Sequence, residues 1–300
     1  MLGTKWGTKE WFESQFNPAQ VKTLGDGWGH RWRGSQKFRY SLCLDMLKPV
    51  LTQNGSMNVL DIGCGLGDFT IQAWKLNPKN QFRGIDISAN AIACVSQIYP
   101  HIQFKVGVLP EIPFKERSFD CIICLEVLYY LVPKDRSQAV ENIYHALRRN
   151  GMVLFSSVLD GGKRYFSEYG IIELISDYFD IQKIQYNYAK LYTAFEKKLM
   201  TIRSHLLVLK SIIEMSDPEY QLWQHDKRPS LKLKVVNGFR KMVSIIPFGK
   251  RITCGYLNLV IKAVMRVLGW KFLPAWFQQI TKFIWRERGQ TQIIILAKKK

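Results

Sequence analysis

The chain lacks an apolar segment near its first residue. Lys5, Trp6 and Lys9 lie within the first nine positions, and no hydrophobic stretch follows them. A secretory signal needs an apolar run of roughly 7–15 residues after its positive charges. We therefore expect no export signal and a cytoplasmic protein. The late segment described below adds a peripheral position at a membrane as an alternative.

Cysteine is sparse, with six residues scattered over 300 positions. Cys121 and Cys124 form a C-x-x-C pair, but they lie inside an apolar run that is typical of a β-strand. Residues three apart on a strand point to opposite faces, so these two thiols cannot share a metal ion. We predict reduced thiols in the core and no metal site.

Acidic residues are also few, with 24 Asp and Glu against 43 Lys and Arg, for a net charge of +19. The excess is local. Residues 59–192 contain as many acidic as basic residues, whereas residues 193–289 contain 18 basic and 6 acidic ones. A uniformly basic nucleic-acid-binding protein does not show this distribution, so we expect the late segment to have a partner of its own.

Short apolar runs alternate with amphipathic helical patterns over residues 57–158, which is typical of a parallel sheet with crossover helices. The predicted strands are 57–62, 82–87, 102–106, 119–125, 151–159, 181–188 and 291–297. We predict an α/β fold with a doubly wound, mostly parallel, Rossmann-like sheet of seven strands. A large helical insertion precedes the last strand.

This pattern divides the chain into four parts. Residues 1–56 form an N-terminal helical lid over the substrate, and residues 57–192 form the core. Residues 193–289 are a basic, aromatic-rich helical insertion, and residues 290–300 hold the last core strand and a basic tail. No internal repeat and no low-complexity tract interrupts this order.

The chemistry is concentrated in one stretch, where an apolar strand leads into Asp61 and then into Gly63, Gly65 and Gly67. Glycines at a strand-to-helix turn let the backbone approach a ligand, because no Cβ stands in the way. A dinucleotide-binding loop needs its third glycine at position 68, which holds Asp68. The spacing disfavours a nicotinamide cofactor, and Asp61 suits the ammonium group of a zwitterionic amino-acid ligand.

A second acid, Asp86, ends the next predicted strand. A carboxylate at the carboxyl end of the second strand can accept both hydroxyls of a ribose. The two acids together indicate a ligand that carries an ammonium group and a nucleoside.

Residues 57–159 resemble a class I S-adenosylmethionine (SAM)-dependent methyltransferase domain. The segment Leu60–Gly65 is similar to the first motif of that family, and Ile85–Ser88 is similar to the second. The chain resembles the NodS-like methyltransferases in particular. Their pattern is matched by Asp26-Gly27-Trp28, by Arg39 and by the run Glu126-Val127-Leu128-Tyr129-Tyr130-Leu131.

The resemblance implies SAM as the cofactor and gives roles to single residues. Gly63, Gly65 and Gly67 would form the turn under the methionine part of SAM, Asp61 would face its ammonium group, and Asp86 would bind the ribose. The other cofactor-binding residues that it implies are Ile87, Val108, Leu125, Arg39 and Trp28.

Two of these positions have specific expectations. Arg39 would close over SAM together with Trp28 and pair with its carboxylate, for which a guanidinium is well shaped. Many relatives carry Asp after the third strand, but here Gly107 is followed by Val108. Adenine would then rely on backbone groups near Val108 and Leu109 and on apolar packing.

Methyl transfer to a hydroxyl or amine also requires the loss of a proton from the acceptor. Candidate bases near the carboxyl edge of the sheet are Glu126 and Tyr129, followed by Tyr130 and His30. Each has a simpler role open to it, because Glu126 can bind the cofactor, the tyrosines can line the pocket and His30 can cap a helix. His145 lies on a helix away from that edge and is expected to be structural.

The methyl acceptor that the resemblance implies is an O or N atom of a small molecule, sugar-like or lipid-like. A nucleic-acid acceptor is disfavoured, because the chain lacks both an Asn/Asp-Pro-Pro-Tyr motif and a Pro-Cys nucleophile. A SAM-binding protein without catalysis, or a membrane scaffold, stays open as an alternative because no base is certain.

The late segment has its own pattern. Residues 257–268 are strongly apolar but contain Lys262 and Arg266, and they are shorter than the roughly 20 residues that span a bilayer. After Gly269, aromatic residues alternate with cations. The segment is expected to form a helical cap over an apolar or lipid-linked acceptor, or to contact an anionic membrane peripherally through residues 253–288.

Overall fold

The computed structural model describes residues 6–16, 28–53, 55–216, 241, 243, 249–285 and 290–300. The chain forms two compact units. Residues Met1–Lys190 and Lys271–Lys300 make up the first unit, and Leu191–Trp270 make up the second. Asp26 and Gly27 of the predicted N-terminal motif lie outside the described residues.

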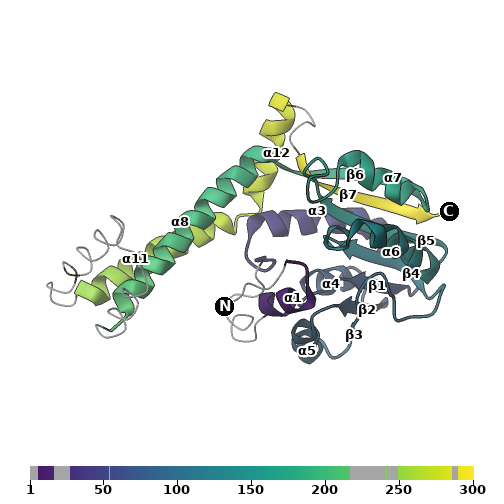
Figure 1. The fold of residues 1–300 in the computed structure, drawn as a ribbon, viewed down its shortest axis with the longest axis horizontal. Coiled ribbons are helices and arrows are strands. Elements are labelled where there is room, and N and C mark those ends of the chain that lie inside the picture. Colours follow the sequence, from purple (N-terminus) through teal and green to yellow (C-terminus); the bar gives the residue numbers. More distant parts are fainter. Residues whose placement is uncertain are drawn as a thin grey trace. The chain divides into compact units, whose positions relative to one another are not determined.

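The first unit is built on a seven-stranded sheet with the strand order β3-β2-β1-β4-β5-β7-β6 (Figure 1). The strands are β1 (Asn58–Ile62), β2 (Gln81–Asp86), β3 (Gln103–Val106), β4 (Phe119–Leu125), β5 (Leu147–Val158), β6 (Phe179–Ala189) and β7 (Gln290–Lys299). Strands β1 to β5 pair in parallel, and β7 is antiparallel to both β5 and β6. The predicted fold is confirmed.

The order of the strands reverses at β1, whose neighbours are β2 on one side and β4 on the other. In open α/β sheets, ligands bind outside the carboxyl ends of the strands at such a switch point. The strand order therefore predicts a ligand site at the carboxyl ends of β1, β2 and β4.

Helices cover both faces of the sheet (Figure 1). Helices α3 (Gly34–Leu51), α4 (Asp68–Trp74) and α5 (Ala89–Ile98) supply side chains to one buried cluster, and α6 (Pro133–Ala146) and α7 (Glu168–Ser176) supply the other. Ser88 caps α5 as predicted, because its hydroxyl accepts a hydrogen bond from the amide of Ala91. Two shorter elements, α1 (Lys9–Gln15) and the 3₁₀ turn η1 (Leu128–Tyr130), lie beside the carboxyl ends of the strands.

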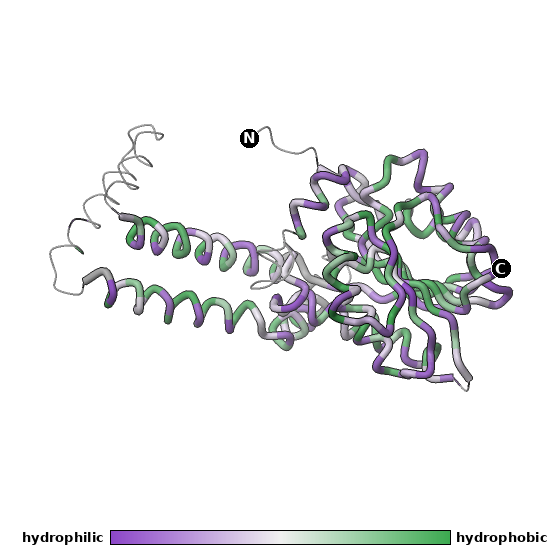
Figure 2. The backbone as a smooth tube through the Cα atoms, turned by 90° about the horizontal axis from the view of Figure 1, so that it is seen from below, coloured by the Kyte–Doolittle hydropathy of each residue, from purple (hydrophilic) through white to green (hydrophobic). Residues whose placement is uncertain are grey.

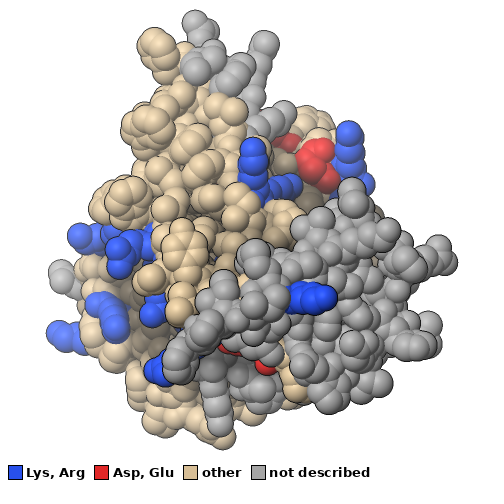
Figure 3. Space-filling view, turned by 90° about the vertical axis from the view of Figure 1, so that its left-hand side faces the viewer, with Lys and Arg blue, Asp and Glu red and all other residues tan. Residues whose placement is uncertain are grey.

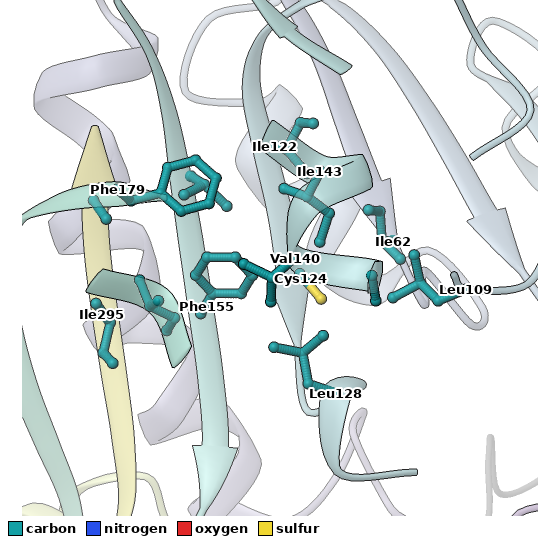
Figure 4. Close-up of a cluster of buried hydrophobic side chains, with 14 of the residues drawn as sticks. Ile62, Leu109, Ile122, Cys124, Leu128, Val140, Ile143, Phe155, Phe179 and Ile295 are labelled. Atoms are coloured by element: carbon teal, nitrogen blue, oxygen red, sulfur yellow. The ribbon is translucent and has the colours of Figure 1, made fainter. Parts of the chain in front are cut away.

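The larger cluster joins the strands to α6 and α7 (Figure 4). Phe155 of β5 packs against Phe179 of β6 with ring centroids 5.9 Å apart. Cys124 lies in this cluster and Cys121 in the cluster on the opposite face, as strand alternation predicts. Both thiols are buried, so they act as core side chains.

Two boundaries differ from the sequence-based expectation. Strand β5 begins at Leu147 rather than at 151, since the chain leaves α6 at Ala146 directly into pairing with β4. The predicted insertion over 193–289 includes α12 (Phe272–Trp285), but this helix belongs to the first unit. The side chain of Gln278 donates a hydrogen bond of 3.1 Å to the carbonyl of Tyr186 in β6, which holds α12 to the sheet.

The second unit contains α8 (Lys190–Glu214) and α11 (Gly249–Leu268), which lie side by side in both ribbon and tube views (Figures 1 and 2). Leu206, Leu209 and Ile213 of α8 form an apolar cluster with Cys254 and Leu257 of α11. Among the described residues, no single helix is both long and apolar enough to cross a bilayer, and α11 and α12 reach that standard only as a bent pair.

Candidate functional site

A cavity of about 450 Å³ lies in the first unit, where β1, β2 and β4 end. Its size is within the range of pockets that hold small molecules and cofactors. All of the predicted catalytic and cofactor-binding residues except Gly67 line it. These are Trp28, Arg39, Asp61, Gly63, Gly65, Asp86, Ile87, Val108, Leu125, Glu126 and Tyr129.

The turn after β1 needs glycine for a reason that the structure makes specific. Gly63 has a φ of +74°, and a Cβ there would lie 2.4 Å from Cγ2 of Val127. The amide groups of Gly63 and Cys64 both donate to the carbonyl of Ile85 in β2, at 2.8 and 3.0 Å. The turn is therefore held against the end of β2, with its backbone exposed to the cavity.

Gly67 belongs to the predicted glycine turn, but it is not among the residues that line the cavity. It is the residue before α4 and has a φ of +73°. A Cβ at this position would lie 2.7 Å from Cγ2 of Val95 in α5. Gly67 thus allows α4 to start close to α5, which is a packing role.

Asp61 is buried at the end of β1. Burial raises the pKa of its carboxyl to about 7, although the Thr70 hydroxyl donates a 2.5 Å hydrogen bond that opposes the shift. The nearby charge of Asp86 raises the pKa of Asp61 further. A buried carboxyl of this kind gains from a positively charged ligand group.

Asp86 is likewise buried, at the end of β2. One carboxylate oxygen accepts the amide of Gly65 at 2.8 Å, and the other accepts the amide of Ser88 at 2.9 Å. Burial nevertheless raises its pKa to about 6. Asp86 therefore ties the glycine turn to the start of α5 and presents a carboxyl to the cavity.

Arg39 of α3 forms an ion pair with Glu126, which follows β4, and the distance from Nη1 to Oε1 is 3.2 Å. The Ser156 hydroxyl of β5 donates to the same Glu126 oxygen at 2.8 Å. Arg39 was expected to pair with the carboxylate of SAM, but in this structure it pairs with a carboxylate of its own chain. No local sequence pattern indicates this pair, because its members are far apart along the chain.

Glu126 has two features that are common at functional sites. Its backbone has a φ of +61°, a left-handed conformation that costs a residue with a side chain of order 1–3 kcal/mol. Its other carboxylate oxygen, Oε2, is buried and accepts no hydrogen bond within the part of the chain that the structure describes. Oε2 is therefore a buried acceptor whose loss of hydration no described donor compensates, which is unusual in a folded protein.

Tyr129 and Tyr130 line the cavity beside Glu126. Burial raises the pKa of both phenols, that of Tyr129 well above its ordinary value, and the charge of Glu126 adds to the rise. Tyr129 therefore keeps its proton at neutral pH. Its hydroxyl can donate a hydrogen bond but is poorly suited to the role of base that the sequence suggested.

An aromatic wall lines one side of the cavity, and sequence analysis identified only Trp28, Tyr129 and Tyr130 of it. It consists of Trp6, Trp11, Phe12, Phe16, Trp28, Tyr129, Tyr130 and Tyr165. Trp6 and Phe12 each lie 4.9 Å from the ring of Tyr130, and Tyr129 lies 4.9 Å from Tyr165. The clustering of Trp11, Phe12 and Phe16 within six residues of the predicted N-terminal lid was the available signal.

His30 and His145, the two histidines considered in the sequence analysis, lie in different places. His30 lines the cavity and stacks on Tyr40, with ring centroids 5.7 Å apart. His145 is half-exposed on α6, lies outside the cavity lining and is 3.8 Å from the carboxylate of Glu141. Its position agrees with a structural role.

Known proteins resemble this chain chiefly over the sheet. Residues 59–151 match the model of a methyltransferase domain family. Over 151 residues the chain is 28% identical to a malonyl-[acyl-carrier protein] O-methyltransferase of Bacillus cereus, which covers 50% of this chain and 53% of that protein. Over 140 residues it is 33% identical to nodulation protein S of Sinorhizobium fredii, covering 44% of this chain and 62% of that protein.

The fold extends further than the sequence similarity. A crystal structure from Galdieria sulphuraria, assigned as a sarcosine dimethylglycine methyltransferase, superposes with a TM-score of 0.52 at 13% identity. It covers 88% of this chain and 86% of that one. The chain spans about half the length of the curated relatives it matches first. Residues 59–151 belong to the methyltransferase domain family, and the chain carries a SAM-dependent methyltransferase domain with the class I fold.

Proposed function

We propose that the protein transfers a methyl group from SAM to an O or N atom of a small acceptor with an apolar body. The strongest support is that a single cavity is lined both by acidic and glycine residues and by aromatic residues. Asp61, Asp86 and the glycine turn line one part of it, and the aromatic wall lines another. The acceptor and the cofactor would thus meet inside one enclosed space.

The residues of the first part suit SAM. Asp61 and Asp86 are buried carboxyls with raised pKa values, which a ligand with an ammonium group and ribose hydroxyls would relieve. Gly63 is exposed and lines the cavity, so its backbone is accessible to the methionine part. Ile87, Val108 and Leu125 offer apolar surface beside them.

SAM, when bound, supplies a methyl group attached to a sulfonium sulfur, and the rest of SAM is the leaving group, which departs as a neutral thioether. The chain then has three tasks, which are to place the acceptor atom in line with the S–CH₃ bond, to exclude water and to receive a proton. Placement alone can contribute roughly 7–11 kcal/mol to lowering the barrier. As the acceptor lone pair bonds to carbon and the C–S pair stays on sulfur, the acceptor O–H or N–H proton must leave.

Glu126 is the residue best placed to receive that proton. Its Oε1 is held by Arg39 and Ser156, while Oε2 is buried in the cavity lining. A positioned base contributes typically about 10²–10⁴-fold to a rate. Tyr129 would orient the acceptor by donating a hydrogen bond, since its pKa keeps it protonated.

The aromatic wall is the reason for proposing an acceptor with an apolar body. Large rings exposed to a cavity gain free energy when an apolar or flat ligand displaces water from them. One face of the Trp6 ring is already covered by the guanidinium of Arg164, 4.0 Å from the ring centroid. The inner rings therefore remain for the acceptor, which agrees with a lipid-like molecule or a sugar-like one that presents a flat face.

Titration calorimetry with SAM, NADH and a short RNA would test the cofactor assignment. Methyl transfer from labelled SAM into extracts of the host cell, compared between wild type and Glu126→Gln, would then test catalysis. We expect SAM to bind alone among the three ligands and the variant to label extracts at least about a hundredfold more slowly. A folded wild type that binds no SAM would refute the proposal, and equal labelling by the variant would remove Glu126 from catalysis.

We further propose that residues 253–288 contact an anionic membrane peripherally, so that the protein is cytoplasmic with a membrane-associated fraction. Helix α11 contains four Lys and Arg and no Asp or Glu. On its exposed face Ile252, Tyr256 and Leu259 follow one another at helical spacing, next to Lys262 and Arg266. Basic residues beside apolar ones suit the interface of an anionic bilayer.

Helix α12 adds a second exposed apolar face. Phe272, Trp276 and Phe283 are between 60% and 90% exposed, while Gln278 and Thr281 are buried within the first unit. Figure 2 shows hydrophobic stretches along α8 and α11. Among the described residues on the face in Figure 3, basic side chains outnumber acidic ones. These features favour a lipid surface over a purely internal cap.

Vesicle co-sedimentation with neutral and with anionic lipids at low salt would test this contact. The variant Phe272→Ser, Trp276→Ser, Phe283→Ser removes the exposed apolar face of α12, and Tyr169→Ser on α7 is a matched control with an exposed ring elsewhere. We expect wild type and control to sediment with anionic vesicles and the triple variant to remain in the supernatant. A wild type that stays in the supernatant would leave only the cap over the acceptor.

A further inference from the structure

Glu13, in the short helix α1, caps the first turn of α5 from outside. Its Oε1 accepts the amide of Ala89 at 2.7 Å, and its Oε2 accepts the Ser88 hydroxyl at 2.7 Å and the amide of Asn90 at 3.1 Å. These donors belong to a segment 75 to 77 residues further along the chain. The first amides of a helix lack partners within it, and the positive end of its dipole favours a carboxylate there.

This contact is a strong one for a residue of a short N-terminal helix. Burial alone would raise the pKa of Glu13, but the hydrogen bonds from Ser88, Asn90 and Ala89, together with the charge of Lys9, outweigh it and lower the pKa. The carboxylate is therefore ionised at neutral pH. Helix α1 is thus fastened to α5 by three charge-assisted hydrogen bonds.

A second contact fastens the end of α1 to the glycine turn. Phe16 is buried in a cluster with Leu66 and Ala91, and Trp28 packs against them. The ring of Phe16 would lie 3.4 Å from a Cβ at Gly65, so it covers the bare backbone at that position. The segment that supplies Trp6, Trp11 and Phe12 to the cavity is therefore attached at Glu13 and at Phe16.

Both attachment points adjoin the predicted cofactor contacts. Ser88, which donates to Glu13, also donates its amide to Asp86, and Asp86 accepts the amide of Gly65, beneath Phe16. The negative charge of Glu13 is felt at Asp86, where it contributes to the raised pKa. The aromatic wall and the carboxyl that is predicted to bind the ribose are thus both attached to residues 86–90, which run from the end of β2 into the first turn of α5.

We propose that Glu13 is a positioning residue that holds the α1 wall of aromatic rings closed over the SAM site through the start of α5. This inference rests on the proposed function in that it takes SAM as the ligand. Glu13 does not touch the reacting atoms. It determines how long the cofactor and the acceptor remain enclosed, and its loss frees the wall to swing away from the glycine turn.

The experiment compares wild type, Glu13→Ala, Glu13→Gln and the control Glu10→Ala, which changes an exposed acid on the same helix. Hydrogen exchange in the ligand-free proteins reports on the amides of residues 9–16. Stopped-flow tryptophan fluorescence reports on SAM dissociation, because Trp11 and Trp28 lie in the wall. We expect Glu13→Ala to lose protection in 9–16 and to release SAM at least about tenfold faster, with Glu13→Gln intermediate and Glu10→Ala like wild type.

Unchanged protection of residues 9–16 in Glu13→Ala would overturn the proposal, and so would lost protection with unchanged SAM release. If Glu13→Ala does not fold, Glu13→Gln carries the same comparison, since it keeps the side-chain shape without the charge. If the wild type binds no SAM, the proposed function fails, whereas the hydrogen-exchange comparison still decides whether Glu13 fastens α1.

Discussion

The guanidinium of Arg39 and the carboxylate of Glu126 form a buried ion pair, 3.2 Å from Nη1 to Oε1, with side chains only 3% and 13% exposed. It joins α3, which precedes the sheet, to the residue directly after β4. The pair brings a cation into a cavity whose other charged lining residues are Asp61, Asp68 and Asp86. Arg39 therefore stabilises the site before any ligand arrives.

Replacement of Arg39 should lower stability as well as SAM affinity. A residue that only closes over SAM, as the sequence analysis expected of Arg39, would affect affinity without affecting stability. Because the structure buries it against Glu126, Arg39→Ala leaves a carboxylate without its cation, which typically costs about 3–5 kcal/mol. We expect a markedly lower midpoint of thermal unfolding, measured by circular dichroism.

The double variant Arg39→Ala, Glu126→Gln completes this measurement. If the two side chains interact as the structure shows, the double variant should be more stable than Arg39→Ala alone, with a coupling energy of about 1 kcal/mol or more. Additive effects of the two substitutions would contradict the ion pair.

Asp86→Ala should weaken SAM binding at least about tenfold, since a lost charge-assisted hydrogen bond costs 1.5–3 kcal/mol. The carboxylate also organises the site, as it accepts the amides of Gly65 and Ser88. Titration calorimetry gives the affinity. Asp45→Ala, an exposed acid on α3 outside the cavity lining, is the control and should bind SAM like wild type. Equal affinities in the two variants would argue against a ribose contact at Asp86.

Sequence reasoning found the parts of the site that local sequence determines. Asp61 and Asp86 end their strands, and Gly63 and Gly65 form the turn between β1 and α4, so the pleat and the parallel order bring them to one edge. The same reasoning predicted a strand over residues 291–297, which corresponds to β7. It did not predict that β7 lies between β5 and β6, because strand order depends on pairing across the whole chain.

The parts that sequence reasoning missed are contacts between distant segments. Glu13 meets Ser88, Arg39 meets Glu126, and Trp6 meets Tyr165 only once the chain has folded. Each of these residues taken alone is an ordinary surface acid, a cation or an aromatic ring. The sequence around Gly67 also does not distinguish two roles, because a glycine before a helix looks the same whether a ligand or a neighbouring helix excludes its Cβ.

Gly67→Ala should separate these two reasons for glycine. The substitution forces a Cβ to within 2.7 Å of Val95 and places a side chain at a φ of +73°, so we expect a loss of stability of about 1–3 kcal/mol. SAM affinity of the folded protein should change little, since Gly67 lies outside the cavity lining. Denaturant unfolding and calorimetry measure the two quantities.

Gly255→Ala is the matched control for that measurement. Gly255 lies within α11, and a Cβ there would meet no atom within 4 Å among the described residues. Alanine favours a helix interior over glycine by roughly 0.5–1 kcal/mol, so this variant should be slightly more stable than wild type. A Gly67→Ala variant with wild-type stability and lost SAM binding would restore the cofactor role that the sequence suggested.

The pH dependence of SAM binding should follow Asp61 and Asp86. Burial raises the pKa of Asp61 from 3.8 to about 7 and that of Asp86 from 3.8 to about 6 in the ligand-free protein. At a pH between 3.8 and these raised pKa values, the folded state binds more protons than the unfolded chain. The contribution of the two carboxyls to stability is therefore full below pH 3.8 and is lost as the pH rises through about 6 for Asp86 and about 7 for Asp61. A ligand ammonium favours the ionised carboxylates, and binding should therefore expel protons.

SAM affinity should consequently increase between about pH 5.5 and about pH 7.5, a range in which the ammonium group of SAM itself stays largely charged. Calorimetry in two buffers of different ionisation enthalpy measures the number of protons released. Asp61→Asn and Asp86→Asn should each flatten the rise, whereas Asp45→Asn should leave it intact. An affinity that does not change over this range, with no proton release, would mean that neither carboxyl is protonated in the free protein or that SAM does not meet them.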